Sequence, residues 1–334
     1  MGSESSYIRS PDLPSNLLKG AIDSHVHAGP VLLSNPSYPD PFQVAEEARD
    51  AGMRAIVYYD VFGNSAGTSW LVSRKTPGID VFGGLILSTC QGGLNPRAVK
   101  TALFYGSGAR FVSFGAHSTR YQANLESRVV DGKLVPIKDV YPAFAEKELP
   151  NTISIPLKDP VPWQLQDILK MVADRPEVYL NTGHVSKAEA LRVIELADRF
   201  GIEKVLLAHP ARGHFSVEEQ RKLGKAGVFL EAALADWHYP TVPRTHYYVE
   251  KEYMDESVLL PRTEISAVAW MNTIREVGPE FFVLCTDYGI RAAASAVQGM
   301  RILIATLLDM EFSVDEIKVM TSTNPARLIG IEAR

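Results

Sequence analysis

The chain has 334 residues, of which 46% are hydrophobic and 22% charged, a composition typical of an ordinary globular protein. Its formal net charge of -5 provides no basic field that would attract nucleic acid or an anionic membrane surface. No apolar run is long enough and free enough of charge to predict a transmembrane helix.

The start of the chain and its cysteines both favour a cytoplasmic location. Residues 1–16 are polar and lack the apolar core of a signal peptide. Only two cysteines occur, Cys90 and Cys285, and both sit in apolar, strand-like runs. We therefore expect two buried free thiols in a reducing compartment.

Eight short apolar runs recur along the chain, each followed by a polar turn and usually by a helical pattern. They are residues 21–29, 53–62, 80–88, 109–117, 177–185, 204–210, 227–234 and 281–289. Continuous apolar runs are typical of strands that are covered on both faces in a parallel sheet. Amphipathic stretches between them, such as 42–52 and 187–201, end at glycine or proline. The pattern predicts a single-domain α/β fold, a closed (β/α)8 (TIM) barrel, rather than an open doubly wound sheet.

Within this organisation, residues 1–20 form an N-terminal extension and residues 21–334 the barrel. Two connections are long, at about 117–162 and about 235–262, and both follow the carboxyl end of a strand. Barrel enzymes build their sites at that face, so we expect both connections to act as lids. In the first, Asp131-Gly132 between β-prone residues predicts a small hairpin.

Polar residues stand at the predicted strand ends. His25 and His27 are two residues apart on the first strand, so both point to the same face. His184 ends the fifth strand, His209 the sixth and Asp287 the eighth. Any one such histidine is usually just hydrogen-bonded, but burying all of these groups together without a ligand is costly. Imidazoles with a carboxylate suit Zn²⁺ or a similar divalent metal with one position open to water.

These strand-end residues, with the DSHVH segment and the tail TSTNPARLIGI (321–331), resemble the amidohydrolase superfamily over residues 21–331. The resemblance implies that His25, His27 and His184 are metal ligands and that Asp287 is both a ligand and the general base. It implies that His209 holds a second metal or polarises the substrate. Since only residues 1–20 precede the first strand, we expect a compact branch without a flanking β-sandwich domain.

The fourth strand departs from the pattern of the binuclear members. Those members bridge two metals with a carboxylated lysine or a glutamate, whereas this strand has Ser113 and Gly115. His117, just beyond it, is more often a substrate contact than a ligand. Glu231 and Asp60 are expected to orient the ligand imidazoles. We therefore predict one bound ion per chain, Zn²⁺ in the first place, with Mn²⁺ or Fe²⁺ as alternatives.

The second long connection is rich in aromatic residues, which suit a flat or apolar small-molecule substrate with an anionic or carbonyl group. The same rings fit the rim of a barrel or the interface of a homo-oligomer equally well. Arg120 and Tyr121 in the first connection leave the same choice open. The predicted substrate contacts are His117, Arg120, Trp237, His238 and Arg244.

The predicted activity is metal-dependent hydrolysis of an amide, cyclic amide, ester or lactone by metal-activated water. Asp287 takes the proton of that water and passes it to the leaving group. The alternative is a metal-dependent non-oxidative decarboxylase of an aromatic or related carboxylic acid, which needs the same ligands. Two further alternatives are a barrel that binds a metal or ligand without turnover and a PHP-type phosphoesterase. Phosphoesterases of the PHP type also begin with an H-x-H motif, but they lack the N-P-A-R tail that this chain has.

Overall fold

The computed structural model describes residues 17–30, 39–238, 265–289 and 294–332. It confirms an α/β fold with parallel sheets, and each of the predicted apolar runs contains a strand. The first sheet has the order β1 (Ile22–Val26), β2 (Ala55–Tyr58), β3 (Asp80–Gly83). The second has the order β11 (Phe282–Cys285), β10 (Phe229–Ala233), β9 (Val205–Leu207), β8 (Tyr179–Asn181), β5 (Phe111–Ser113), β4 (Leu85–Ile86).

The described strands of the eight apolar runs form these two sheets and not the single closed sheet that the sequence predicts. At one boundary the third apolar run is split at Gly84, where a Cβ would lie 2.4 Å from the carbonyl oxygen of Phe111. At the other boundary the amide of Asp287 donates to the carbonyl of His25 over 2.9 Å. The amide of His27 donates to the carbonyl of Tyr288 over 2.7 Å. The ends of β1 and β11 therefore lie side by side.

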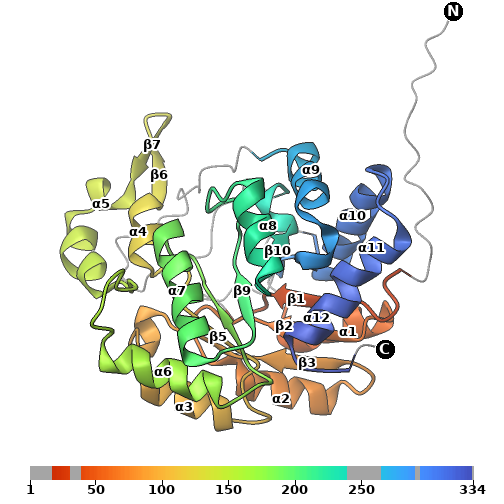
Figure 1. The fold of residues 1–334 in the computed structure, drawn as a ribbon, viewed down its shortest axis with the longest axis horizontal. Helices are drawn as coiled ribbons and strands as arrows, with labels where there is room; N and C mark the ends of the chain where they lie inside the picture. Colours follow the sequence, from red (N-terminus) through yellow and green to blue (C-terminus); the bar gives the residue numbers. More distant parts are fainter. Residues whose placement is uncertain (1–16, 31–38, 239–264, 290–293, 333–334) are drawn as a thin grey trace, which may run out of the picture.

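Helices from all parts of the chain lie around the strands (Figure 1). Serines cap α7 (Lys187–Phe200) and α8 (Val217–Lys225) in capping boxes with Glu189 and Glu219, which satisfies backbone donors at each helix start. The longer helices are α1 (Pro41–Asp50), α2 (Ser65–Lys75), α3 (Pro96–Phe104), α6 (Trp163–Ala173), α7 (Lys187–Phe200), α8 (Val217–Lys225), α9 (Ala267–Val277) and α10 (Ala296–Asp309). The short ones outside the first long connection are η1 (Thr89–Gln91), η4 (Leu234–Asp236), η6 (Pro279–Phe281), α11 (Val314–Lys318), η7 (Val319–Thr323) and α12 (Asn324–Leu328).

The connection at 117–162 carries its own secondary structure and projects beside α7 (Figure 1). Its elements are α4 (Arg120–Leu125), β6 (Ser127–Val130), β7 (Lys133–Pro136), α5 (Ile137–Val140), η2 (Phe144–Glu148) and η3 (Leu149–Asn151). The predicted hairpin is confirmed, because β6 and β7 pair antiparallel through Asp131 and Gly132, both at positive φ. Most of the connection predicted at 235–262 lies outside the described residues.

The expectation for the two cysteines is half wrong. Cys285 on β11 is buried, but Cys90 is exposed. The apolar run ends at Ser88, and Cys90 falls in the 3-10 turn η1, where no sheet covers it. Among the described residues, no helix is long and apolar enough to span a bilayer.

Candidate functional site

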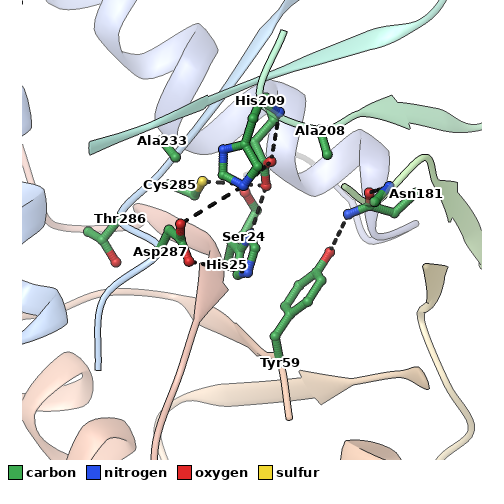
Figure 2. A network of polar contacts seen from close by, with 12 residues as sticks. Ser24, His25, Tyr59, Asn181, Ala208, His209, Ala233, Cys285, Thr286 and Asp287 are labelled. Carbon is green, nitrogen blue, oxygen red and sulfur yellow. Dashed lines mark hydrogen bonds and ion pairs between the residues drawn. The ribbon is translucent and has the colours of Figure 1, made fainter. Parts of the chain in front are cut away.

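The carboxyl ends of β1 and β11 bring His25, His27 and Asp287 together. Nε2 of His27 lies 2.9 Å from Oδ1 of Asp287, and Nε2 of His25 lies 3.6 Å from the same oxygen. Both imidazoles therefore reach the same oxygen, that of His25 from within β1 and that of His27 from the residue after it. Figure 2 shows His25, Asp287 and His209 converging from three strand ends.

Three imidazoles of the cluster are anchored in the same way, with Nδ1 against an oxygen. The acceptors are Glu231 for His25 at 2.8 Å, the carbonyl of Tyr59 for His27 at 2.9 Å, and Asp236 for His209 at 2.9 Å. Because these oxygens accept, each Nδ1 carries the hydrogen, and each Nε2 is left to face the site. The orientation of the rings is therefore fixed from outside the cluster.

The Nε2 atom of His209 is buried and, among the described residues, has no hydrogen-bond partner. It lies 3.6 Å from a carboxylate oxygen of Glu231 and 3.9 Å from Oδ2 of Asp287. A buried polar atom without a partner costs free energy, so such an atom in a folded protein indicates a missing ligand.

Two overlapping groups of side chains have the donor chemistry and spacing to hold a metal ion. One is His25, His27 and Asp287, and the other is His25, His209 and Glu231. Nitrogen and carboxylate ligands suit Zn²⁺ and related divalent ions. The orphaned Nε2 of His209 also points to a bound group here, so the residues present fit a divalent metal.

The carboxylates of the site are held ionised. Burial raises the pKa of Asp287, but the facing His25, His27 and His209 outweigh it and hold that pKa well below its usual value. Burial likewise opposes ionisation of Glu231, and the neighbouring His209 and His25 bring its pKa below the usual value. The site therefore presents negative oxygens to a cation.

Asp23, two residues before His25, behaves in the opposite way. Its side chain accepts hydrogen bonds from Thr286 over 2.6 and 3.0 Å. Burial nevertheless dominates and raises the pKa of Asp23 to about 7.

His184, the remaining predicted ligand, lies beside the cluster but in neither candidate group. Its ring centroid is 5.1 Å from that of His209 and 5.6 Å from that of His117. Burial, with the positive groups His209 and His117 next to it, lowers the pKa of His184 well below its usual value. The ring is therefore neutral, the form that binds a metal, and its role as a ligand stays a prediction.

The predicted substrate contacts are in different surroundings. His117 stands next to His184, with Nδ1 2.6 Å from the buried carboxylate of Glu126. Arg120 is exposed and donates from Nε to Thr152 over 2.7 Å, so it packs against its own connection.

Trp237 and His238 follow β10. The half-buried Trp237 packs with its ring centroid 6.4 Å from that of Trp270. Nδ1 of His238 lies 2.5 Å from the hydroxyl of Tyr288, which follows β11. Arg244 lies outside the described residues.

Sequence reasoning did not single out Asp236 or Arg212. Nε of Arg212 is 2.7 Å from Oδ1 of Asp236, the carboxylate that also anchors His209. Nη2 of Arg212 is 3.9 Å from Oδ2 of Asp287. Both residues follow strand ends, on β9 and β10, and that position is the one signal that points to them.

Known structures share this fold. A β-aspartyl dipeptidase from Fervidobacterium islandicum AW-1, in complex with a β-Asp-Leu dipeptide, is 14% identical over 93% of this chain and 75% of that one, with a TM-score of 0.55. A putative 2-pyrone-4,6-dicarboxylic acid hydrolase from Pseudomonas putida is 12% identical over 94% and 99%, with a TM-score of 0.53. An amidohydrolase from Burkholderia multivorans with bound zinc is 14% identical over 93% and 99%, with a TM-score of 0.52.

At these identities the likeness shows a common fold. No curated protein matches the sequence. A family model does match it, over residues 20–231, which include His25, His27, His184, His209 and Glu231. The chain therefore belongs to the family described as DUF6282, a family of unknown function.

Proposed function

We propose that this protein is a metal-dependent hydrolase of the amidohydrolase type, acting on an amide, cyclic amide, ester or lactone of a small molecule. One observation carries the proposal: three imidazole Nε2 atoms lie 2.9 to 3.9 Å from the carboxylate of Asp287. Oxygen acceptors at Nδ1 of each imidazole, from Glu231, Tyr59 and Asp236, fix the orientation of the three rings. Such convergence at strand ends is the arrangement of a catalytic metal site.

The scaffold of this site is proposed to be a compact (β/α)8 barrel formed by residues 21–334, with residues 1–20 as an extension. The strand order supports it, because β3 continues into β4 through Gly84 and the end of β1 hydrogen-bonds beside β11. Full strand pairing at these two boundaries, between β3 and β4 and between β1 and β11, would place the carboxyl ends of all the barrel strands around one rim.

The proposed ligands are His25, His27, His184 and Asp287, holding one divalent ion per chain, Zn²⁺ in the first place. The ion would supply Lewis-acid polarisation of the substrate carbonyl and a lowered pKa for the attacking water. His184 supports this assignment through its neutral ring and its position beside His209.

The chain's own residues would move the proton. Asp287, held ionised by its imidazole neighbours, accepts the proton of the attacking water and delivers it to the leaving group. Burial and the charge of Arg212 lower the pKa of His209, but Glu231 and Asp236 outweigh them and raise it. A protonated His209, locked by Asp236, then stabilises the oxyanion that develops on the substrate.

The similar structures are named for enzymes that act on a peptide bond and on a cyclic ester. The test is metal analysis of the purified protein, then assay of lactones, cyclic amides, β-aspartyl dipeptides and hydroxybenzoates. We expect a stoichiometric divalent metal and release of a carboxylic acid from one class, with none from the matched Asp287→Asn variant. Release of CO2 from a hydroxybenzoate would establish the decarboxylase alternative. A metal-free protein that turns over none of these compounds would contradict the proposal.

A further inference from the structure

Arg212 occupies a particular position over the candidate site. It belongs to the turn after β9, three residues beyond His209, and its guanidinium reaches from Asp236 to Asp287. Its side chain is 27% exposed, whereas those of Asp236 and Asp287 are 0% and 13% exposed. Arg212 is therefore the most exposed of these three side chains.

Its charge is of a different kind from the other positive groups nearby. In the described part of the chain, the other cationic partners of these carboxylates are imidazoles, whose charge depends on pH. Arginine stays charged at any physiological pH. This charge reaches the centre of the site, because Nη2 of Arg212 lies 3.9 Å from Oδ2 of Asp287.

A divalent ion and Arg212 would together offset the three carboxylates Glu231, Asp236 and Asp287. The protonated His209 of the proposed mechanism would add one further positive charge. An anionic substrate would meet no net repulsion on entry. The guanidinium is also already oriented by Asp236, so that holding a ligand costs it little further conformational entropy.

We propose that Arg212 binds a carboxylate of the substrate and so selects anionic carbonyl compounds over neutral ones. This inference rests on the proposed function, since it concerns the same site. A carbonyl that reaches Asp287 lies within a few ångström of Arg212, because Nη2 is 3.9 Å from Oδ2 of Asp287. A carboxylate next to that carbonyl would meet the planar fork of the guanidinium, which matches carboxylate geometry. A neutral neighbour would desolvate the charge without replacing its hydrogen bonds.

The test is calorimetric titration of the metal-loaded protein with succinate and with its uncharged diamide, succinamide. The wild type should bind succinate roughly tenfold or more tightly than succinamide, the range for a charge-assisted hydrogen bond. Arg212→Gln should remove that preference, and Arg212→Lys should keep part of it. The matched control is Arg221→Gln on α8, whose guanidinium donates to the carbonyl of Glu276, and it should bind as the wild type does.

Equal binding of the two probes by the wild type would overturn the inference. So would a preference that survives Arg212→Gln, because the metal alone would then hold the carboxylate. If Arg212→Gln does not fold, Arg212→Lys decides, since a compact ammonium in place of the fork should weaken succinate binding severalfold. Metal content is measured separately on each protein, and titrations are repeated after chelation. Absence of metal would therefore contradict the proposed function, whereas a metal-loaded wild type that binds both probes equally would contradict the role of Arg212.

Discussion

Nε2 of His27 and Oδ1 of Asp287 lie 2.9 Å apart, although 260 positions separate the two residues in the chain. The contact forms because the carbonyls and amides of the segments after β1 and β11 pair directly. Asp287 adopts a φ of 56°, a left-handed conformation that aspartate tolerates better than most residues. With this backbone conformation, the carboxylate of Asp287 lies against the imidazoles of His25 and His27.

Replacing both His25 and His27 by alanine should abolish tight metal binding. The double variant His25→Ala, His27→Ala loses two anchored nitrogen donors, and the two proposed ligands that remain, His184 and Asp287, cannot replace them. Elemental analysis after dialysis should give stoichiometric metal in the wild type and almost none in the variant. His214→Asn, in an exposed turn at positive φ that asparagine tolerates, is the control and should keep its metal. Unchanged metal in the double variant would remove the basis of the site.

Asp287→Asn should fold but lose turnover by about 10²–10⁴-fold, the usual contribution of a general base. Asparagine has the same shape and also tolerates the positive φ at this position, so a loss of kcat would not be due to backbone strain. The measurement is kcat on samples matched for metal content and for melting temperature. A kcat equal to that of the wild type would leave Asp287 as a structural residue or ligand.

The wild type should bind one metal ion per chain, because β5 provides no anionic bridge for a second ion. His209→Ala should then keep the metal and lose activity, since its Nε2 faces the site while its Nδ1 is held by Asp236. The readouts are the metal-to-protein ratio and kcat. Two ions in the wild type, with one lost from the His209 variant, would show that His25, His209 and Glu231 hold a second ion.

The metal-free protein should become less stable as the pH rises from about 6.5 to about 8. Burial raises the pKa of Asp23 to about 7 in the folded state, so between its ordinary value and 7 the folded chain binds the extra proton. The proton on Asp23 alone would make the free energy of unfolding fall across that range, but below pH 6.5 the lowered pKa of His184 acts in the opposite direction. Above pH 6.5 the raised pKa values of His27 and His209 add to the fall, while Asp287 and Glu231 are already fully ionised.

Urea unfolding of the chelated protein at several pH values measures this dependence. Asp23→Asn mimics the protonated acid and should show a flatter profile than the wild type. A profile that is equally steep in the variant would assign the pH dependence to other groups.

The buried carboxylate of Glu126 should matter through His117. Losing the 2.6 Å contact in Glu126→Gln frees the imidazole to turn, so KM for the assayed substrate should rise by about tenfold with less change in kcat. His117→Ala should act similarly, and the double variant should add little, because both changes remove one interaction. Exposed Glu146→Gln in the same connection is the control. Strictly additive effects would show that the two residues act independently.

The order of strands, the hairpin and the common face of His25 and His27 are determined by the sequence. Each depends on local rules: apolar runs cover both faces of parallel strands, Asp131-Gly132 fits a tight turn, and side chains two apart on a strand point the same way. Strand ends in a parallel sheet also share one edge, which is why His209 and Asp287 could be grouped from sequence alone.

The partners of those residues were decided by the tertiary structure. Contacts of Glu231 with His25, and of Arg212 with Asp236, join side chains that are distant in sequence or lie in irregular turns, where no periodic pattern specifies direction. The exposure of Cys90 and the division of the strands into two sheets likewise depend on how separate elements pack. Local pattern fixes which face a side chain takes, whereas its distance to another segment depends on the packing of the whole chain.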